Sequence, residues 1–182
     1  MLKYLLLIFL SFLTTESIAN NKENIINNLK NTNNISFEFE QNINQKIEKG
    51  NCIVQYPKKI FCEYVGSNNK VLVSNGKSLV IKTKTSYYRY PLEKTPLNYI
   101  LDKNFLIKKI YNLKESVLDN SFINFIINEN DNEINVFFEK TTSNLIGWQT
   151  KDIYQNVSIT LLSSVKKNEI IDEDLFTIPL QN

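Results

Sequence analysis

The side chains most able to do chemistry in this chain are two cysteines and two pairs of neighbouring carboxylates. The 182 residues include no histidine, which excludes Ser-His-Asp and Cys-His catalysis and removes the commonest metal ligand. Two cysteines are too few for a structural zinc site, and the four glycines form no phosphate-binding loop. We therefore expect neither a bound metal nor a nucleotide cofactor.

The carboxylates could act as an acid and a base only if a pair faced a common pocket. Glu38 and Glu40 alternate with phenylalanines, and this pattern places them on the polar face of a strand. Glu173 and Asp174 lie in a polar segment close to the end of the chain. Because the sequence also offers no clear nucleophile for a lipid substrate, we predict that the chain is not an enzyme.

The spacing of Cys52 and Cys62 indicates a structural role for the two thiols. If a hairpin turn is centred on Pro57, the two cysteines lie opposite each other on one face of a sheet. A disulfide is then possible in an exported protein. A register shifted by one residue would place Glu63 opposite Cys52 and leave two buried free thiols. Both alternatives are open from the sequence.

The start of the chain has the pattern of an export signal. Lys3 precedes an apolar run at residues 5–13, and Ser17-Ile18-Ala19 has the small residues of a cleavage site. The run is too short to span a bilayer. We expect residues 1–19 to be a signal peptide and residues 20–182 to be a single domain; the alternative is a buried N-terminal helix. The net charge of +2 gives no indication of nucleic-acid binding.

Alternating apolar residues separated by turn signals predict a sheet that positions the side chains. Residues 50–81 contain three or four antiparallel strands, and Asn75-Gly76 predicts a type I′ turn with positive φ at both central residues. Residues 35–41 alternate cleanly, and further strand patterns follow up to residue 161. One set of side chains should point inward and bind a hydrophobic ligand or, alternatively, form a closed core: Ile35, Phe37, Phe39, Val54, Tyr56, Ile60 and Tyr64.

Short helical patterns accompany the strands. Residues 20–34 form a weak amphipathic helix, Thr95-Pro96 is a helix start with Thr95 as the N-cap, and a second piece spans residues 105–113. Helices this short are unstable alone, so we expect three apolar residues to lie against the sheet as a lid: Leu97, Ile100 and Leu101. The predicted fold class is mainly β with α. It is a strongly curved, incompletely closed antiparallel β-barrel of about ten or eleven strands, with an N-terminal helix and a short helical lid.

Several stretches match, in the same order along the chain, the pattern of one known family. Phe37-Glu38-Phe39-Glu40-Gln41 resembles the family's first strand, which ends in Phe-x-Gln. Val73-Ser74-Asn75-Gly76-Lys77 is similar to its Val-Ser-Asp-Gly-Lys turn. The other matching stretches are residues 50–57 with Tyr64, 95–101, 145–146 with Asp152, and 175–179. Together they resemble the periplasmic outer-membrane lipoprotein carrier proteins of the Lol pathway.

This resemblance implies a function as well as a fold. A carrier of this family would accept acylated lipoproteins from an ATP-driven release complex in the inner membrane. It would shield their acyl chains across the periplasm and pass them to an outer-membrane lipoprotein acceptor. The resemblance also implies a monomer without a cofactor. The alternative is a periplasmic sensor domain of the same fold, which would detect lipids or mislocalised lipoproteins.

The sequence departs from the family pattern at the residues that hold the lid. The family has an arginine before the hairpin proline, which contacts the lid and helps to hold the empty carrier closed; that position is Tyr56 here. A neutral phenol makes no charge-assisted contact, although Lys58 or Lys59 could substitute from another position on the turn. The family's Phe-x-Trp falls on Ile60 and Cys62. We therefore expect apolar packing to hold most of the lid.

Overall fold

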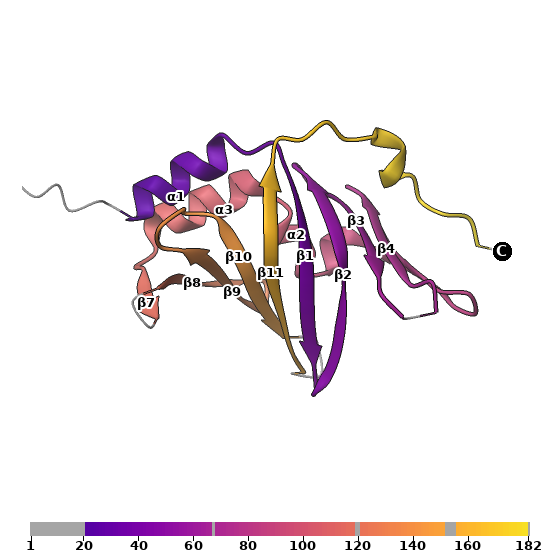
Figure 1. Ribbon diagram of the computed structural model, residues 1–182. Coiled ribbons are helices and arrows are strands. Elements are labelled where there is room, and N and C mark those ends of the chain that lie inside the picture. Colours follow the sequence, from indigo (N-terminus) through magenta and orange to yellow (C-terminus); the bar gives the residue numbers. More distant parts are fainter. Residues whose placement is uncertain (1–20, 67, 119–120, 152–155, 182) are drawn as a thin grey trace, which may run out of the picture.

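The computed structural model describes residues 21–66, 68–118, 121–151 and 156–181. These residues form one antiparallel sheet of eleven strands with three α-helices packed along it (Figure 1). The strand order is β6-β5-β4-β3-β2-β1-β11-β10-β9-β8-β7. The end strands β6 and β7 do not pair with each other, so the curved sheet is an incompletely closed barrel and the predicted fold class is confirmed.

The elements have the following bounds. The strands are β1 Asn34–Ile43, β2 Lys46–Gln55, β3 Lys59–Tyr64, β4 Val71–Asn75, β5 Ser78–Lys82, β6 Tyr87–Pro91, β7 Ser116–Leu118, β8 Phe122–Glu129, β9 Asn132–Glu139, β10 Leu145–Lys151 and β11 Val157–Lys167. The helices are α1 Asn21–Lys30, α2 Leu97–Ile100 and α3 Lys103–Asn112, with two 3₁₀ turns, η1 Leu92–Lys94 and η2 Glu173–Phe176.

Strand β1 lies at the centre of the sheet and joins its two halves. It pairs with β2 on one side and with the last strand, β11, on the other. Ile35, Phe37 and Phe39 are buried while Glu38 is exposed, as the alternation predicts. Gly50 lies opposite Phe39, and a Cβ atom at Gly50 would lie 2.8 Å from the Phe39 ring. Glycine at this position therefore leaves room for an inward-facing aromatic ring.

Strands β2 to β5 form the predicted meander, with one error in its turns. The β2–β3 hairpin has the first of the two registers that the sequence leaves open, with Cys52 opposite Cys62, and the two cysteines form a disulfide. The type I′ turn at Asn75-Gly76 is wrong, because of these two residues only Gly76 has a positive φ, of 92°. The Asn75 side chain instead accepts hydrogen bonds at 3.1 and 3.0 Å from the backbone N–H groups of the two residues after Gly76. This side-chain turn replaces the predicted backbone turn.

Helices α1 and α3 lie side by side along the half of the sheet formed by β8 to β10 (Figure 1). The helices and these strands together bury a large apolar core, which includes Ile25, Leu29, Leu106, Ile110, Phe125 and Phe138. Helix α1 ends at Lys30, earlier than the predicted residue 34. The chain leaves the helix where the Thr32 hydroxyl donates to the Asn28 carbonyl at 2.7 Å, and β1 follows at once.

The lid segment, residues 92–102, runs from η1 through α2 to the start of α3. Thr95 is not the predicted N-cap, because its hydroxyl donates to the Leu92 carbonyl at 2.8 Å and α2 begins only after Pro96. Helix α3 begins earlier than predicted, because the Asp102 carboxylate caps it by accepting a hydrogen bond from the Phe105 backbone N–H at 3.1 Å. The lid segment therefore begins with the turn between Leu92 and Thr95 and ends at the capped start of α3.

Three further outcomes concern the edge of the sheet, the two ends of the chain and the lengths of the helices. Strand β7 was not predicted, and the segment near the end of the chain forms the turn η2 against β3 and β4. The predicted signal peptide at residues 1–19 lies outside the described residues. Among the described helices, none combines the length and the apolar character that a bilayer crossing requires.

Candidate functional site

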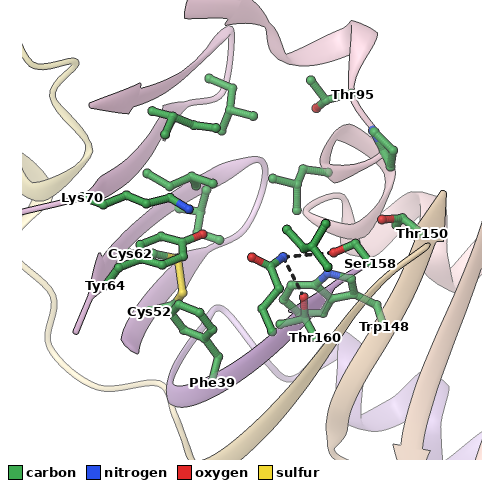
Figure 2. A pocket seen from close by; sticks show the side chains of 18 residues that line it. Phe39, Cys52, Cys62, Tyr64, Lys70, Thr95, Trp148, Thr150, Ser158 and Thr160 are labelled. Carbon is green, nitrogen blue, oxygen red and sulfur yellow. Dashed lines mark hydrogen bonds between the residues drawn. A yellow bond between two sulfur atoms is a disulfide. The ribbon is translucent and has the colours of Figure 1, made fainter. Parts of the chain in front are cut away.

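A cavity of about 270 Å³ lies between the inner face of the sheet and the start of α2. Figure 2 shows its lining side chains, which converge from strands on both sides of β1. The walls come from β1 to β5, from β10 and β11, and from residues 95–97 of the lid segment. Most of the lining side chains are apolar, which suits a ligand with a hydrocarbon portion.

The apolar wall is formed by β2 to β5, the lid segment and Phe39 of β1. The Cys52–Cys62 disulfide is part of this wall (Figure 2), so the sulfur atoms line the cavity. Phe39 and Tyr64 meet edge to face, with their ring centroids 5.0 Å apart. The wall is completed by Ile60, Leu72, Leu79, Ile81 and Leu97.

The opposite wall, formed by β1, β10 and β11, carries polar side chains. Gln41 Nε2 donates hydrogen bonds to Ser158 Oγ at 3.2 Å and to Thr160 Oγ1 at 3.1 Å (dashed lines in Figure 2). Thr160 lies opposite Gln41 on one side and Trp148 on the other, so these side chains form a row across the sheet. Thr150 lies opposite Ser158 in the next row. We call Gln41, Thr150, Ser158 and Thr160 the polar strip.

A buried carboxylate and two lysines lie next to the polar strip. The Lys70 ammonium is 2.5 Å from the Glu48 carboxylate and 4.0 Å from the centroid of the Tyr64 ring. Glu48 is only 7% exposed and also contacts Lys46 at 2.8 Å. Burial on its own would raise the pKa of Glu48, but the hydrogen bonds and charges of the two lysines outweigh burial and hold that pKa below its usual value. Burial, together with the nearby Glu48 charge, raises the pKa of Tyr64 and keeps its phenol neutral.

The structure divides the seven predicted ligand-binding residues into two groups. Phe39, Ile60 and Tyr64 line the cavity. The other four do not line it, because the cavity occupies only part of the inner face: Ile35, Phe37, Val54 and Tyr56. Ile35 and Tyr56 instead border a space of only about 10 Å³ beside α1, and Phe37 packs its ring 6.2 Å from Trp148. In the closed state these four residues belong to the core or to its edge.

Comparison with models of known families gives one decisive match. Residues 30–179 match the family described as outer membrane lipoprotein carrier protein LolA. The chain belongs to the LolA family. A search of curated proteins found no match to the chain.

Solved structures are similar to the chain at low sequence identity. An uncharacterized conserved protein from Thermus thermophilus is similar with a TM-score of 0.52 and 8% identity, over 88% of this chain and 94% of that chain. A LolA superfamily protein from Nitrosomonas europaea has a TM-score of 0.41 and 8% identity, over 86% of this chain and 97% of that chain. At such identities the similarity concerns the fold alone.

The lid contact of this LolA-family chain comes from Lys58, two positions after the expected one. The Lys58 backbone N–H donates to the Leu101 carbonyl at 2.7 Å, and the Lys58 ammonium lies 3.6 Å from the Asp102 carboxylate. The Tyr56 side chain instead borders the small space beside α1, and burial raises the pKa of its phenol. The three predicted lid residues lie against the sheet side, with Leu97 in the cavity wall and Ile100 and Leu101 fully buried.

Sequence reasoning missed several lining residues of the LolA-type cavity. Gln41 continues the inward phase of Ile35, Phe37 and Phe39, so the alternation could have identified it. The signal for Thr160 and Trp148 is weak, because both enter the cavity only through the pairing of β11 with β1 and with β10. The carboxylate pairs lie elsewhere: Glu38 and Glu40 are exposed on the outer side of β1, and η2 carries Glu173 and Asp174.

Proposed function

We propose that this LolA-family chain is a periplasmic carrier that binds the acyl chains of lipoproteins released from the inner membrane and delivers them to the outer membrane. The single observation that carries the proposal is the apolar cavity under a short helical lid, in a chain that matches the lipoprotein-carrier family over residues 30–179. The proposed role is binding and transfer, without catalysis.

The size of the cavity supports a carrier that also has to release its cargo. Each buried CH₂ group contributes about 0.8 kcal/mol, and the acyl groups of a lipoprotein contain dozens of them, so complete burial would prevent release. The cavity of about 270 Å³ is slightly smaller than typical ligand pockets, which hold about 300–1,000 Å³. An open sheet edge and a short lid would let the cavity expand around part of the chains and then give them up.

The proposed role includes a cellular location and partner proteins. Residues 1–19 would be the signal peptide, and residues 20–182 would form a single carrier domain in the periplasm. An ATP-driven complex in the inner membrane would load the carrier, and an outer-membrane acceptor would unload it. The carrier would act as a monomer, because the cavity is formed within one chain.

A binding experiment tests the proposal with a reporter that the chain already contains. Trp148 is the single tryptophan and lines the cavity, so its fluorescence should change when a ligand binds. We expect the protein purified from the periplasm to bind an acylated lipoprotein peptide and to ignore the same peptide without acyl chains. Ile81→Asp, which places a charge in the cavity wall, should abolish binding. The matched control Ile126→Asp, at an exposed strand position, should leave binding unchanged.

A cellular experiment tests the transfer role. Lipoproteins should copurify with the chain when their release from it is blocked or slowed. A purified protein that neither binds the acylated peptide nor keeps a lipoprotein soluble would refute the carrier. Turnover of ester substrates by the purified protein would instead indicate an enzyme.

A further inference from the structure

We propose that the polar strip binds the uncharged headgroup of an acylated glycerol, so that the cavity accepts an acyl chain in one orientation. The ester carbonyl and hydroxyl groups of the ligand would lie on Gln41, Ser158 and Thr160, and its acyl chain would run toward Leu79 and the lid segment. This inference rests on the proposed function and adds the chemical class of the bound group.

The hydrogen bonds within the strip leave a defined set of groups for a ligand. Gln41 uses its Nε2 group for bonds to the Ser158 and Thr160 oxygen atoms. Within the part of the chain that the structure describes, the hydrogens of these two hydroxyls and the Gln41 carbonyl oxygen have no other hydrogen-bond partner. The strip therefore offers two O–H donors, which suit an ester carbonyl, and one acceptor, which suits a ligand hydroxyl.

Thr160 is buried and Gln41 and Ser158 are half-buried, so a ligand that fills the cavity would leave the polar groups of the strip costly unless it gives them partners. Thr160 is only 3% exposed, and Trp148 covers the neighbouring position in the same row. A hydrocarbon pushed against the strip would remove water from the hydroxyls and the Gln41 oxygen and return no hydrogen bond. A ligand that carries its own carbonyl and hydroxyl groups at one end avoids this loss, and this asymmetry sets the orientation.

The charges beside the strip favour an uncharged headgroup over an anionic one. Glu48 lies directly opposite Gln41 on β2 but does not line the cavity, and the charged residue in the cavity lining is Lys70. Lys46 and Lys70 already contact the Glu48 oxygens. A fatty-acid carboxylate would therefore have to compete with Glu48 for Lys70, whereas a glyceride needs no cation.

The test compares three probes on the purified full protein. Monodecanoylglycerol carries the proposed headgroup, decanoate carries an anionic one, and N-phenyl-1-naphthylamine is an apolar probe without either. The loss of one neutral hydrogen bond corresponds to about a fivefold change in Kd. Gln41→Leu removes the acceptor for the ligand hydroxyl and should weaken monodecanoylglycerol binding about fivefold, while binding of the naphthylamine stays within about twofold. Thr160→Val has the same shape as wild type and should weaken monodecanoylglycerol binding in the same direction.

A control variant and two contrary outcomes show whether a failure concerns the headgroup inference alone or the carrier proposal as well. Leu79→Ala removes contact area from the apolar wall and should weaken all three probes together. If both Gln41→Leu and Thr160→Val leave the glyceride-to-naphthylamine ratio unchanged, or if wild type prefers decanoate, the inference is wrong although the carrier proposal stands. If wild type binds neither the naphthylamine nor an acylated peptide, the carrier proposal itself fails. Should Gln41→Leu not fold, as judged by circular dichroism, the isosteric Thr160→Val decides alone.

Discussion

Removing the charge of Lys58 tests whether an ion pair contributes to holding the lid closed. The Lys58 and Asp102 side chains are 33% and 25% exposed, and their charged atoms lie 3.6 Å apart. At an effective dielectric constant of about 20, the Coulomb attraction at such a distance is about 4–5 kcal/mol. Desolvation and side-chain ordering offset most of this attraction, and partly exposed pairs of this kind contribute about 0.2–1 kcal/mol. We therefore expect Lys58→Met to shift the ratio of closed to open lid by up to about fivefold.

The backbone contact of the same residue should survive this substitution. The bond from the Lys58 N–H to the Leu101 carbonyl, at 2.7 Å, does not involve the side chain. Lys58→Met should therefore loosen the lid without releasing it. The measurement is hydrogen exchange of the α2 amides, together with the rate at which the protein takes up N-phenyl-1-naphthylamine. Both rates should rise by up to about fivefold at low salt, and the difference from wild type should shrink in 1 M salt, where the Debye length falls to about 3 Å.

The neighbouring lysine provides a matched control. Lys59 pairs with Glu173 of η2 at 2.6 Å, away from the lid segment. Lys59→Met should therefore leave both rates at the wild-type value. Equal rates for Lys58→Met and wild type at low salt would refute the ion-pair contribution. A difference that persists unchanged in 1 M salt would show that Lys58 acts through packing instead of charge.

Three further predictions concern the cavity wall and its edge. Phe39→Asp should abolish binding of an acylated peptide in a protein that stays folded by circular dichroism, because Phe39 lines the cavity; an unfolded variant would contradict this. Reduction of the Cys52–Cys62 disulfide, which closes a loop with a sequence separation of 10, should lower the free energy of unfolding by about 2–3 kcal/mol in urea titrations; an unchanged midpoint would count against it. The folded-state pKa of Glu48 lies below its ordinary value of 4.5, so its contribution to stability is present above that value and is lost as pH falls through the folded-state pKa. Glu48→Gln should flatten the rise of unfolding free energy with pH in this acidic range, and an unchanged slope would show that other groups cause it.

Local patterns were sufficient to predict most of the sheet. The alternation of residues 35–41 predicts β1 because its one buried face determines which side chains point inward. The pairing of β1 with β11 could not be predicted, since it joins segments more than a hundred residues apart and no local turn specifies it. The turn at Asn75-Gly76 was mispredicted because a side-chain acceptor formed the turn with a different backbone geometry.

The candidate site was predictable only where it depends on one strand. The alternation along β1 correctly predicts that Ile35 and Phe39 point inward. It does not predict that Phe39 lines the cavity while Ile35 lies beside α1, because this depends on where the helices pack. The contact of Lys70 with Tyr64 and Glu48 also depends on how the chain returns after β3. The residue types alone did not predict this contact, because lysine and glutamate usually lie on the surface of a protein.

The small cavity and the weak lid contact are connected through the energetics of uptake. In the proposed carrier, an acyl chain larger than the cavity of about 270 Å³ would bind after the lid segment moves, and its apparent affinity would then be the intrinsic affinity reduced by the fraction of open protein. Helix α2, of four residues, has no stability of its own. Its position depends on burial of Ile100 and Leu101, on the contacts of Lys58, and on the hydrogen bond that the Asn130 amide donates to the Tyr99 hydroxyl at 3.0 Å. Each kcal/mol removed from these contacts raises the open fraction about fivefold while the lid is mostly closed, and it raises the apparent affinity by the same factor. In the proposed carrier, a lid held by apolar packing and by these few polar contacts would favour loading, and release would then depend on a partner that binds the carrier or accepts its lipid.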